Sequence, residues 1–161
     1  MAINLRLEGA PELAAALGRS PELLAQEEGR AMTASLLLVE ADARRNVAHD
    51  TRQLMNSITH RQRREGETLV GEVGPSARYG VVVERGRRPK RRWPPRAALR
   101  GWARRHGIPE RALFLIARKI GQQGTPARPF LEPALRKNEA RIQRLFAAAG
   151  LRVVTRIGEA T

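Results

Sequence analysis

Residues 20–47 read SPELLAQEEGRAMTASLLLVEADARRNV, and they decide the fold because they predict one long amphipathic helix. Ser20 suits the capping position and Pro21 the first helical position, where the missing amide hydrogen costs nothing. No proline interrupts the remaining residues. The apolar residues that recur at helical spacing, and that we expect on one face, are Leu24, Met32, Leu36, Val39 and Ala43. The charged residues that we expect mostly on other faces are Glu27, Glu28, Glu40, Arg44 and Arg45.

Shorter elements are predicted on either side of this helix. Ile3, Leu5 and Leu7 alternate with polar residues, which is the period of a half-buried strand, and a short helix is expected over residues 10–18. After the long helix, Asp50 is a candidate N-cap for a short helix through Ile58. Two runs of strand-forming residues then flank Glu65-Gly66 and predict a β-hairpin, residues 58–64 and 67–73.

The second half of the chain is predicted to be mainly helical. A helix after Pro95 ends at Gly107, a second begins at Pro109 and stops at Gly121, and a last one runs over residues 130–149. Its candidate apolar stripe is Leu131, Leu135, Ile142, Leu145 and Phe146. Leu151 to Ile157 is expected as a terminal strand. No long repeat or linker divides the sequence, so we expect a single domain, residues 1–161, with a basic insertion at about 85–105.

The chain is strongly basic. It has 161 residues and 30 Lys and Arg against 16 Asp and Glu, a formal net charge of +14, and Arg outnumbers Lys 27 to 3. Residues 85–105 contain ten basic and no acidic residues, which leaves 20 basic against 16 acidic elsewhere. A polyanionic partner is therefore expected, and it should be sought at this segment. The chain has no cysteine, which excludes disulfides and thiolate metal sites.

No pattern in the sequence predicts a catalytic centre. The three histidines, His49, His60 and His106, lack the spacing of metal ligands, and the two aspartates with dispersed glutamates do not form a two-metal site. We find neither a phosphate-binding glycine loop nor a nucleophile elbow. No apolar run approaches a membrane span, and the N-terminus lacks the pattern of a signal peptide. We expect a protein made inside the cell that is not an enzyme and needs no cofactor or metal.

Three segments, in order, resemble motifs of one protein family. NVAHDTRQLMNSI (46–58) is similar to A-P-x-D-T-G-x-L-x-x-S-I, VGPSARYGVVVERG (73–86) to Y-A-x-x-V-E-x-G, and GTPARPFLEPAL (124–135) to R-P-F-L-x-P-A-L. The family is the tail-completion or head–tail joining proteins of tailed bacteriophages. This chain departs from the first pattern, because Arg52 stands where Gly is usual and no Pro precedes Asp50. The residues that match the motifs, or lie within them as structural positions, are Asp50, Thr51, Leu54, Ser57, Tyr79, Glu84, Gly86, Pro129, Phe130, Leu131, Pro133 and Ala134.

The resemblance implies an α+β fold in which a long helix packs on a small antiparallel sheet and a C-terminal helix follows. It also implies a short helix over residues 77–85, although Val81 to Val83 favour a strand by propensity. The implied function is that of a virion protein of the phage neck, assembled in the bacterial cytoplasm as a ring subunit, with a hexamer as one candidate form. Its implied partners are neck and tail proteins, namely a tail terminator and head-completion or connector proteins, with no membrane.

The basic segment has several interpretations that the sequence leaves open. It is a solvated loop, a surface that contacts DNA phosphates, or a surface that pairs with acidic residues of a neighbouring protein. A nucleic-acid-binding protein that uses residues 85–120 is the alternative function. Trp93 and Trp102 are either core residues or interface anchors. The residues expected to face an anionic partner are Arg85, Arg87, Arg88, Lys90, Arg91, Arg92, Arg96, Arg100 and Arg104.

Overall fold

The computed structural model describes residues 3–7, 21–47, 52–89 and 93–159. These residues belong to two compact units. Unit 1 comprises Met1–Gly80 and Pro129–Thr161, and unit 2 comprises Val81–Arg128. Unit 2 extends beyond the predicted basic insertion at both ends.

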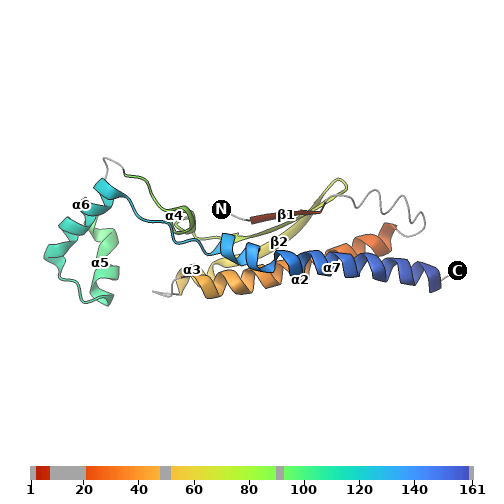
Figure 1. Ribbon diagram of the computed structural model, residues 1–161. Coiled ribbons are helices and arrows are strands. Elements are labelled where there is room, and N and C mark those ends of the chain that lie inside the picture. Colours follow the sequence, from red (N-terminus) through yellow and green to blue (C-terminus); the bar gives the residue numbers. More distant parts are fainter. Residues whose placement is uncertain (1–2, 8–20, 48–51, 90–92, 160–161) are drawn as a thin grey trace. The chain divides into compact units, whose positions relative to one another are not determined.

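Unit 1 has the predicted α+β architecture, in which a long helix packs on a small antiparallel sheet (Figure 1). The helix is α2 (Pro21–Asn46), and the three-stranded sheet has the order β1-β3-β2. The strands are β1 (Ile3–Leu7), β2 (Ile58–Glu65) and β3 (Thr68–Pro75). The predicted hairpin is confirmed, with Gly66 at a positive φ of 60° in its turn.

The predicted apolar face of α2 is buried, as the spacing indicated. Met32, Leu36, Val39 and Ala43 are fully buried, and Leu24 is 6% exposed. The helix lies close to the central strand, because a Cβ atom at Gly71 would stand 2.4 Å from the Sδ atom of Met32. Leu69 and Val73 lie two residues to either side of Gly71 and are also buried. This face of β3 therefore forms the core with α2.

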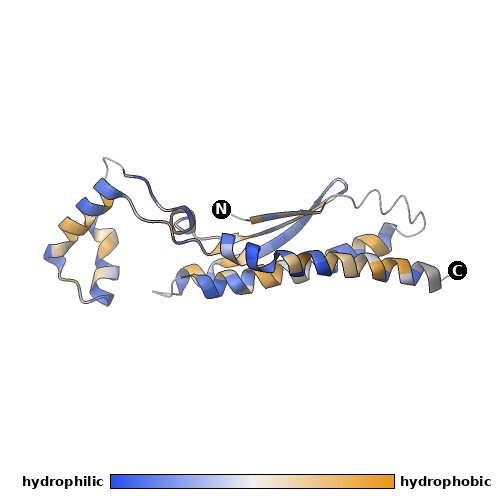
Figure 2. Ribbon diagram, in the orientation of Figure 1, coloured by the Kyte–Doolittle hydropathy of each residue, from blue (hydrophilic) through white to orange (hydrophobic). Residues whose placement is uncertain are grey.

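The C-terminal helix, α7 (Leu131–Glu159), is longer than predicted and lies beside α2 (Figure 1). The predicted strand at 151–157 is wrong, since α7 continues through it. The β-branched residues of segment 151–157 favour a strand by propensity. The segment is helical because Val153 continues the buried apolar stripe of α7, where it has no exposed surface. Figure 2 shows hydrophobic and hydrophilic residues alternating along both helices. The buried apolar residues of the stripe are Leu131, Ala134, Ile142, Ala149 and Val153, while Leu135, Leu145 and Phe146 are half-buried.

The expectation that the acidic residues of α2 lie away from the core is wrong for Glu27, Glu28 and Glu40, which are 1%, 5% and 8% exposed. Glu27 and Glu28 each pair with a cation from another element, whereas Glu40 pairs with Arg44 on α2 itself and contacts His60 on β2. Glu27 accepts a 2.7 Å hydrogen bond from Arg152 on α7, and Glu28 accepts one of 3.0 Å from Arg64 on β2. A buried carboxylate is tolerated where such a partner offsets its lost hydration.

The turn after α2 differs in detail from the prediction. Helix α3 (Gln53–Asn56) ends two residues earlier than expected, and Arg52 rather than Asp50 occupies its N-cap position. Arg52 has a φ of 56°, a left-handed conformation that favours glycine. The predicted roles of Asp50 and Thr51, and the predicted helix at 10–18, lie outside the described residues.

Unit 2 is built mainly from two helices, α5 (Arg96–Arg105) and α6 (Leu113–Gln123), with a 3₁₀ turn, η1 (Glu110–Ala112), between them. A short helix, α4 (Gly80–Arg85), spans the boundary between the units and confirms the helix implied by the resemblance. Gly107 ends α5 as predicted. The predicted stop at Gly121 is wrong, because Gly121 is buried inside α6 and the helix ends at Gly124. Among the described residues, no helix is long and apolar enough to cross a membrane.

Candidate anion-binding module

Net charge is distributed very unevenly between the two units. Unit 1 contains 16 basic and 14 acidic residues. Unit 2 contains 14 basic residues but only two acidic residues, Glu84 and Glu110. Unit 2 therefore carries +12 of the total of +14, in 48 residues. Two carboxylates cannot neutralise fourteen cations within the unit, so most of this charge is available to a partner.

In unit 1, by contrast, cations and buried carboxylates compensate one another. Five carboxylates of α2 and β3 are at most 8% exposed, and each contacts at least one basic side chain. Hydrogen bonds from Arg152 and from Arg30 hold the pKa of Glu27 below its usual range. The pairs are Glu27 with Arg30, Arg152 and Arg156; Glu28 with Arg64; Glu40 with Arg44 and His60; Asp42 with Arg45 and Lys137; and Glu72 with Arg61 and Arg63.

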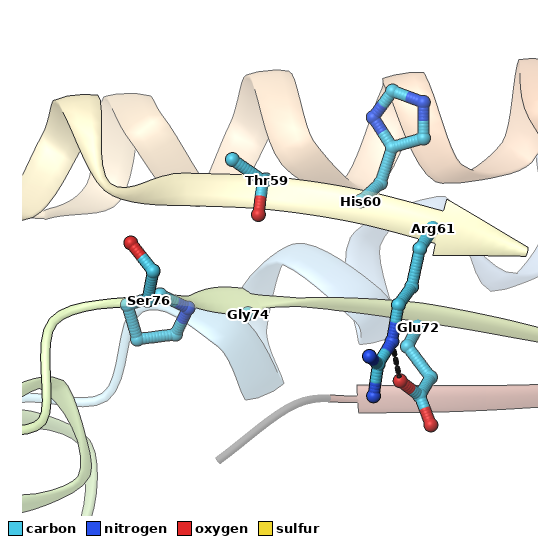
Figure 3. A pocket seen from close by; sticks show the side chains of 7 residues that line it. Thr59, His60, Arg61, Glu72, Gly74 and Ser76 are labelled. Carbon is cyan, nitrogen blue, oxygen red and sulfur yellow. Dashed lines mark hydrogen bonds and ion pairs between the residues drawn. The ribbon is translucent and has the colours of Figure 1, made fainter.

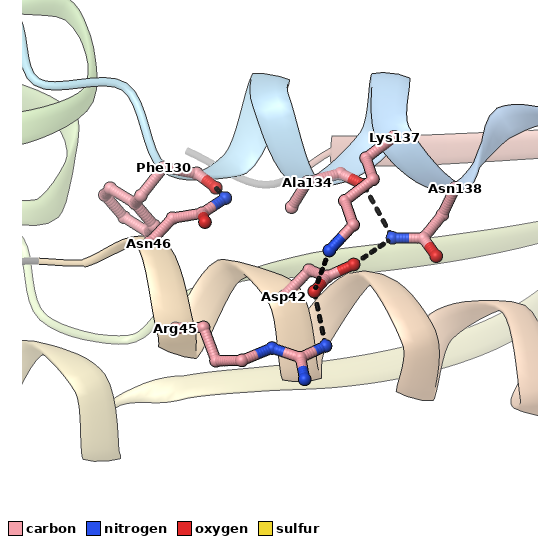
Figure 4. Close-up of polar contacts among 7 residues, drawn as sticks. All are labelled: Asp42, Arg45, Asn46, Phe130, Ala134, Lys137 and Asn138. Atoms are coloured by element: carbon pink, nitrogen blue, oxygen red, sulfur yellow. Dashed lines mark hydrogen bonds and ion pairs between the residues drawn. The ribbon is translucent and has the colours of Figure 1, made fainter.

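Asp42 shows how closely these charges are matched (Figure 4). Asn138, buried on α7, donates a 2.6 Å hydrogen bond to Oδ2 of Asp42 and another of 2.9 Å to the carbonyl of Ala134. Lys137 lies 3.1 Å from Oδ1, which Arg45 also contacts. The hydrogen bond from Asn138 and these two cations lower the pKa of Asp42 from 3.8 to about 2. This cluster holds α7 against α2 and offers no open site.

A hollow of about 300 Å³ on the sheet is similarly self-compensated (Figure 3). Arg61 and Glu72 lie directly opposite each other on β2 and β3 and form an ion pair. Hydrogen bonds from Arg63 and Arg61 lower the pKa of Glu72. His60 points to the opposite face, where it contacts Glu40 on α2. The charged groups at this hollow therefore already have partners within unit 1.

The helical pair of unit 2 has a well-defined turn. The amide of Ile108 donates to the carbonyl of Ala103, and that of Gly107 donates to Arg104. This is the Schellman arrangement, which needs a left-handed residue after the helix, and Gly107 supplies a φ of 66°. Ala103, Leu113 and Ala117 form the small buried core between the helices.

Trp93 packs across α6 at the position of Gly121. A Cβ atom there would lie 2.0 Å from Cδ1 of the indole, so only glycine fits this contact. The indole also meets the ring of Phe114 edge-on, with 5.5 Å between the ring centroids. Trp93 is nevertheless 41% exposed and Phe114 46% exposed. Trp93 thus packs on α6 and Phe114 but is not a buried core residue, and its predicted role as an interface anchor stays a prediction.

The predicted arginine stripe on α5 is formed. Arg96, Arg100 and Arg104 are all exposed and follow at intervals of four residues, so they share one helical face over about 12 Å. Arg100 pairs with Glu110 at 2.8 Å. Beside the stripe lies a hollow of about 190 Å³ whose lining is Arg100, Ala103, Arg104, Ile108, Glu110 and Leu113.

The two chain segments that enter and leave the helical pair are joined by a backbone clasp. Arg87 and Thr125 exchange both amide hydrogen bonds, at 2.9 and 2.8 Å, and the amide of Arg128 donates to Val83 at 2.8 Å. Two glycines with positive φ allow this approach. A Cβ atom at Gly86 would lie 2.7 Å from the carbonyl oxygen of Thr125, and one at Gly124 would lie 2.0 Å from that of Arg87.

The other predicted partner-facing residues are placed as follows. Arg85 and Arg88 are exposed, Arg87 is half-buried in the clasp, and Trp102 is half-buried beside His106 on α5. Lys90, Arg91 and Arg92 lie outside the described residues. Sequence reasoning missed further basic residues of the unit, although counting charge beyond residue 105 would have found them. The missed residues, all exposed, are Arg111, Arg118, Lys119 and Arg128.

The motif residues of unit 1 and α4 are mainly structural. Phe130, Leu131 and Ala134 are buried at the start of α7, and Pro133 is exposed in its first turn. Leu54 and Glu84 are buried, Ser57 bonds the carbonyl of Leu54, and Tyr79 is 43% exposed. Among the described residues, no group of three His, Asp or Glu is placed to hold a metal ion.

Comparisons with family models, curated proteins and solved structures found no match to this chain.

Proposed function

We propose that this chain is a structural protein of the neck of a tailed bacteriophage, where it completes the tail and joins it to the DNA-filled head. It acts as a subunit of a ring-like assembly. The proposal starts from the three ordered sequence segments that resemble the tail-completion family. The hydrogen bonds that these three segments make with one another add support to the resemblance.

The contacts among the three segments are the main structural observation in support of the proposal. The carbonyl of Ser57, in the first segment, accepts a 2.8 Å bond from the amide of Ser76 in the second. Asn46, also in the first, donates to the carbonyl of Phe130 in the third. The second and third segments meet at the hydrogen bond between Val83 and Arg128. Segments that contact each other are expected to be retained together, which favours a shared origin over three chance matches.

The conformation of Arg52 gives independent support. It stands where the family pattern has glycine, and its φ of 56° is in the region that glycine prefers. The backbone here has the geometry for which a glycine would be selected. The departure from the pattern at this position is thus a change of side chain with the glycine-type conformation kept.

In this role the protein is not an enzyme and uses no cofactor. Its partners are other neck and tail proteins, such as a tail terminator and head-completion or connector proteins, and it is located in the virion. Exposed aromatic residues next to arginines suit such protein contacts, since both residue types are enriched at interface hot spots. Trp93 and Phe114 with the neighbouring Arg118 provide such a surface on unit 2.

The test is a deletion of the gene in the phage or prophage that carries it, with electron microscopy of the lysate. We expect DNA-filled heads and complete tails that are not joined, and restoration of joined virions by a plasmid copy. Normal virions from the deletion strain would overturn the proposal. Mass spectrometry of purified wild-type virions provides the control, because a neck protein must be present in them.

The alternative function is that of a nucleic-acid-binding protein without a role in the virion, and the charge of unit 2 is what favours it. A sequence-reading regulator fits the structure less well. In a helix-turn-helix protein the second helix reads the bases, but α6 exposes Phe114 and Leu115 at 46% and 62%. A nanomolar, sequence-specific complex with duplex DNA at physiological salt would favour this alternative over the neck protein.

A further inference from the structure

We propose that residues 87–125 form a self-contained module that binds the phosphate backbone of duplex DNA without regard to sequence, through the arginine stripe of α5 and the basic residues around it. The proposal does not rest on the neck assignment. It follows from the charge of unit 2, the kind of cation used, and the way in which the module is closed at its base.

The amount of uncompensated charge favours duplex DNA over an acidic protein. Unit 2 carries +12, and duplex DNA presents one negative charge per 1.7 Å or so of its axis, so about 20 Å of duplex supplies twelve phosphates. A protein partner would have to offer a dozen uncompensated carboxylates over the same length. The five buried carboxylates of α2 and β3 in this chain cannot do so for a second copy, because each already has a basic partner within unit 1.

The type and placement of the cations also suit phosphate. Twelve of the fourteen are arginines, whose planar fork matches two phosphate oxygens at once. On α5, Arg96, Arg100 and Arg104 extend over about 12 Å, close to the width of the DNA major groove. The stripe can therefore reach phosphates on the two sides of a groove. Exposed basic residues on α6 and the turn before it, Arg111, Arg118 and Lys119, extend the charged surface beyond one helix face.

The clasp makes the module separable from the remainder of the chain. Arg87 and Thr125 form a hydrogen-bonded antiparallel pair, the geometry that a two-residue hairpin loop closes. Residues 88–124 can accordingly be replaced by Asn-Gly without moving the two ends. The replacement removes eleven basic residues and one acidic residue, so the net charge falls from +14 to +4.

The experiment measures binding of a fluorescein-labelled 24-base-pair duplex by anisotropy, at salt concentrations between 50 and 200 mM. For the full chain we expect affinities that agree within about threefold for unrelated sequences and that fall steeply with salt. The triple variant R96Q/R100Q/R104Q should bind at least about tenfold more weakly. The slope of the logarithm of its binding constant against the logarithm of the salt concentration should be shallower by about 2.7. This is about 0.9 for each of the three phosphates that the variant no longer neutralises.

The matched control is R136Q/R141Q/R144Q, which removes the same charge from exposed positions of α7. This control variant should keep the salt slope of the full chain. If both triple variants lose the same amount of DNA affinity, the effect is one of net charge alone and the proposal is overturned. The Asn-Gly replacement should abolish binding and keep the far-ultraviolet circular dichroism of unit 1. Undiminished binding by a folded replacement variant would contradict the proposal, and if that variant does not fold, the two triples decide.

Two further outcomes would also overturn it. A poly-glutamate peptide that competes as strongly as unlabelled duplex, per charge, would identify an acidic protein as the occupant. A preference of a hundredfold or more for one DNA sequence would indicate base reading. Neither result bears on the virion experiment above, so failure of this proposal and failure of the neck assignment can be told apart.

Discussion

At the scale of single residues, Gly121 shows how one missing side chain fixes an aromatic contact. Alanine in the interior of a helix normally stabilises by about 0.5–1 kcal/mol relative to glycine. At Gly121 the added methyl group would lie 2.0 Å from Cδ1 of Trp93, so the indole must move. We expect G121A to reverse the usual sign and to destabilise unit 2 by about 1 kcal/mol.

Gly101 is the matched control for this prediction. It also lies inside a helix, but the nearest atom to its added Cβ is the end of the Arg105 side chain at 3.5 Å. G101A should therefore stabilise the same unit. Urea unfolding followed by tryptophan fluorescence measures both variants, because the two tryptophans of the chain, Trp93 and Trp102, lie in unit 2. Stabilisation by G121A would contradict the packing described here.

Asp42 leads to a prediction about pH. Its pKa is about 2 in the folded protein and 3.8 ordinarily, so the unfolded chain takes up this proton at a higher pH. The stability that the carboxylate contributes is complete above about pH 5 and is lost as the pH falls from there toward 2. We expect D42N to be less stable than the wild type at pH 7 and to show a flatter pH dependence below pH 5.

Urea unfolding followed by circular dichroism at a series of pH values tests this. The wild type should still lose stability in acid for a second reason, since Glu27 and Glu72 also have lowered pKa values. A pH profile of D42N parallel to that of the wild type would show that Asp42 does not contribute.

At the scale of elements, the end of α7 is the part that sequence reasoning assigned to the wrong structure. Removal of residues 151–161 tests the helix, since it deletes fully buried Val153 and two partners of Glu27, Arg152 and Arg156. Loss of Val153 burial alone should cost about 1.5–3 kcal/mol. A lower urea midpoint by circular dichroism is the expected result, and an unchanged midpoint would contradict the packing of this segment on α2.

The elements that could be predicted are those whose signals are local. The long helix, the hairpin and the helix after Pro95 follow from periodicity, turn residues and proline placement within each segment. The failures depend on distant partners. Burial of Glu27 requires Arg152, 125 residues later, and the helical state of Val153 depends on α2. Gly121 reads as a helix stop until Trp93, 28 residues earlier, is known to pack on it.

The candidate site was predicted in part. The density of arginine at 85–105 identified the basic segment, and the proline at position 95 placed Arg96, Arg100 and Arg104 on one helix. The true extent of the charged unit, to Arg128, was missed. The clasp could not be foreseen, because the pairing of Arg87 with Thr125 joins residues 38 positions apart and leaves no periodic pattern.

At the scale of the whole molecule, the two units differ in how much core they have. Unit 1 buries many large apolar side chains between α2, α7 and the sheet, while the buried residues of unit 2 include Ala103, Leu113 and Ala117. We expect unit 2 to unfold at lower urea concentration. Tryptophan fluorescence should change before most of the circular dichroism is lost, and coincident transitions would show one cooperative unit.

Unfolding in the presence of duplex DNA provides a second test of this prediction. A ligand that binds only folded unit 2 should raise the fluorescence midpoint and leave the later transition unchanged. If DNA moves both transitions equally, then the stabilities of the two units are coupled.

The clasp has a consequence for the evolution of this chain. Because the strands on either side of the module are already paired at Arg87 and Thr125, insertion or loss of residues between them leaves the pair itself intact. Relatives are therefore expected to vary in length at this one position, from a two-residue turn to a complete domain, while residues 21–80 and 129–156 keep their spacing. Aligned homologues with length changes concentrated between positions 87 and 125 would identify the charged segment as one that is gained or lost as a unit.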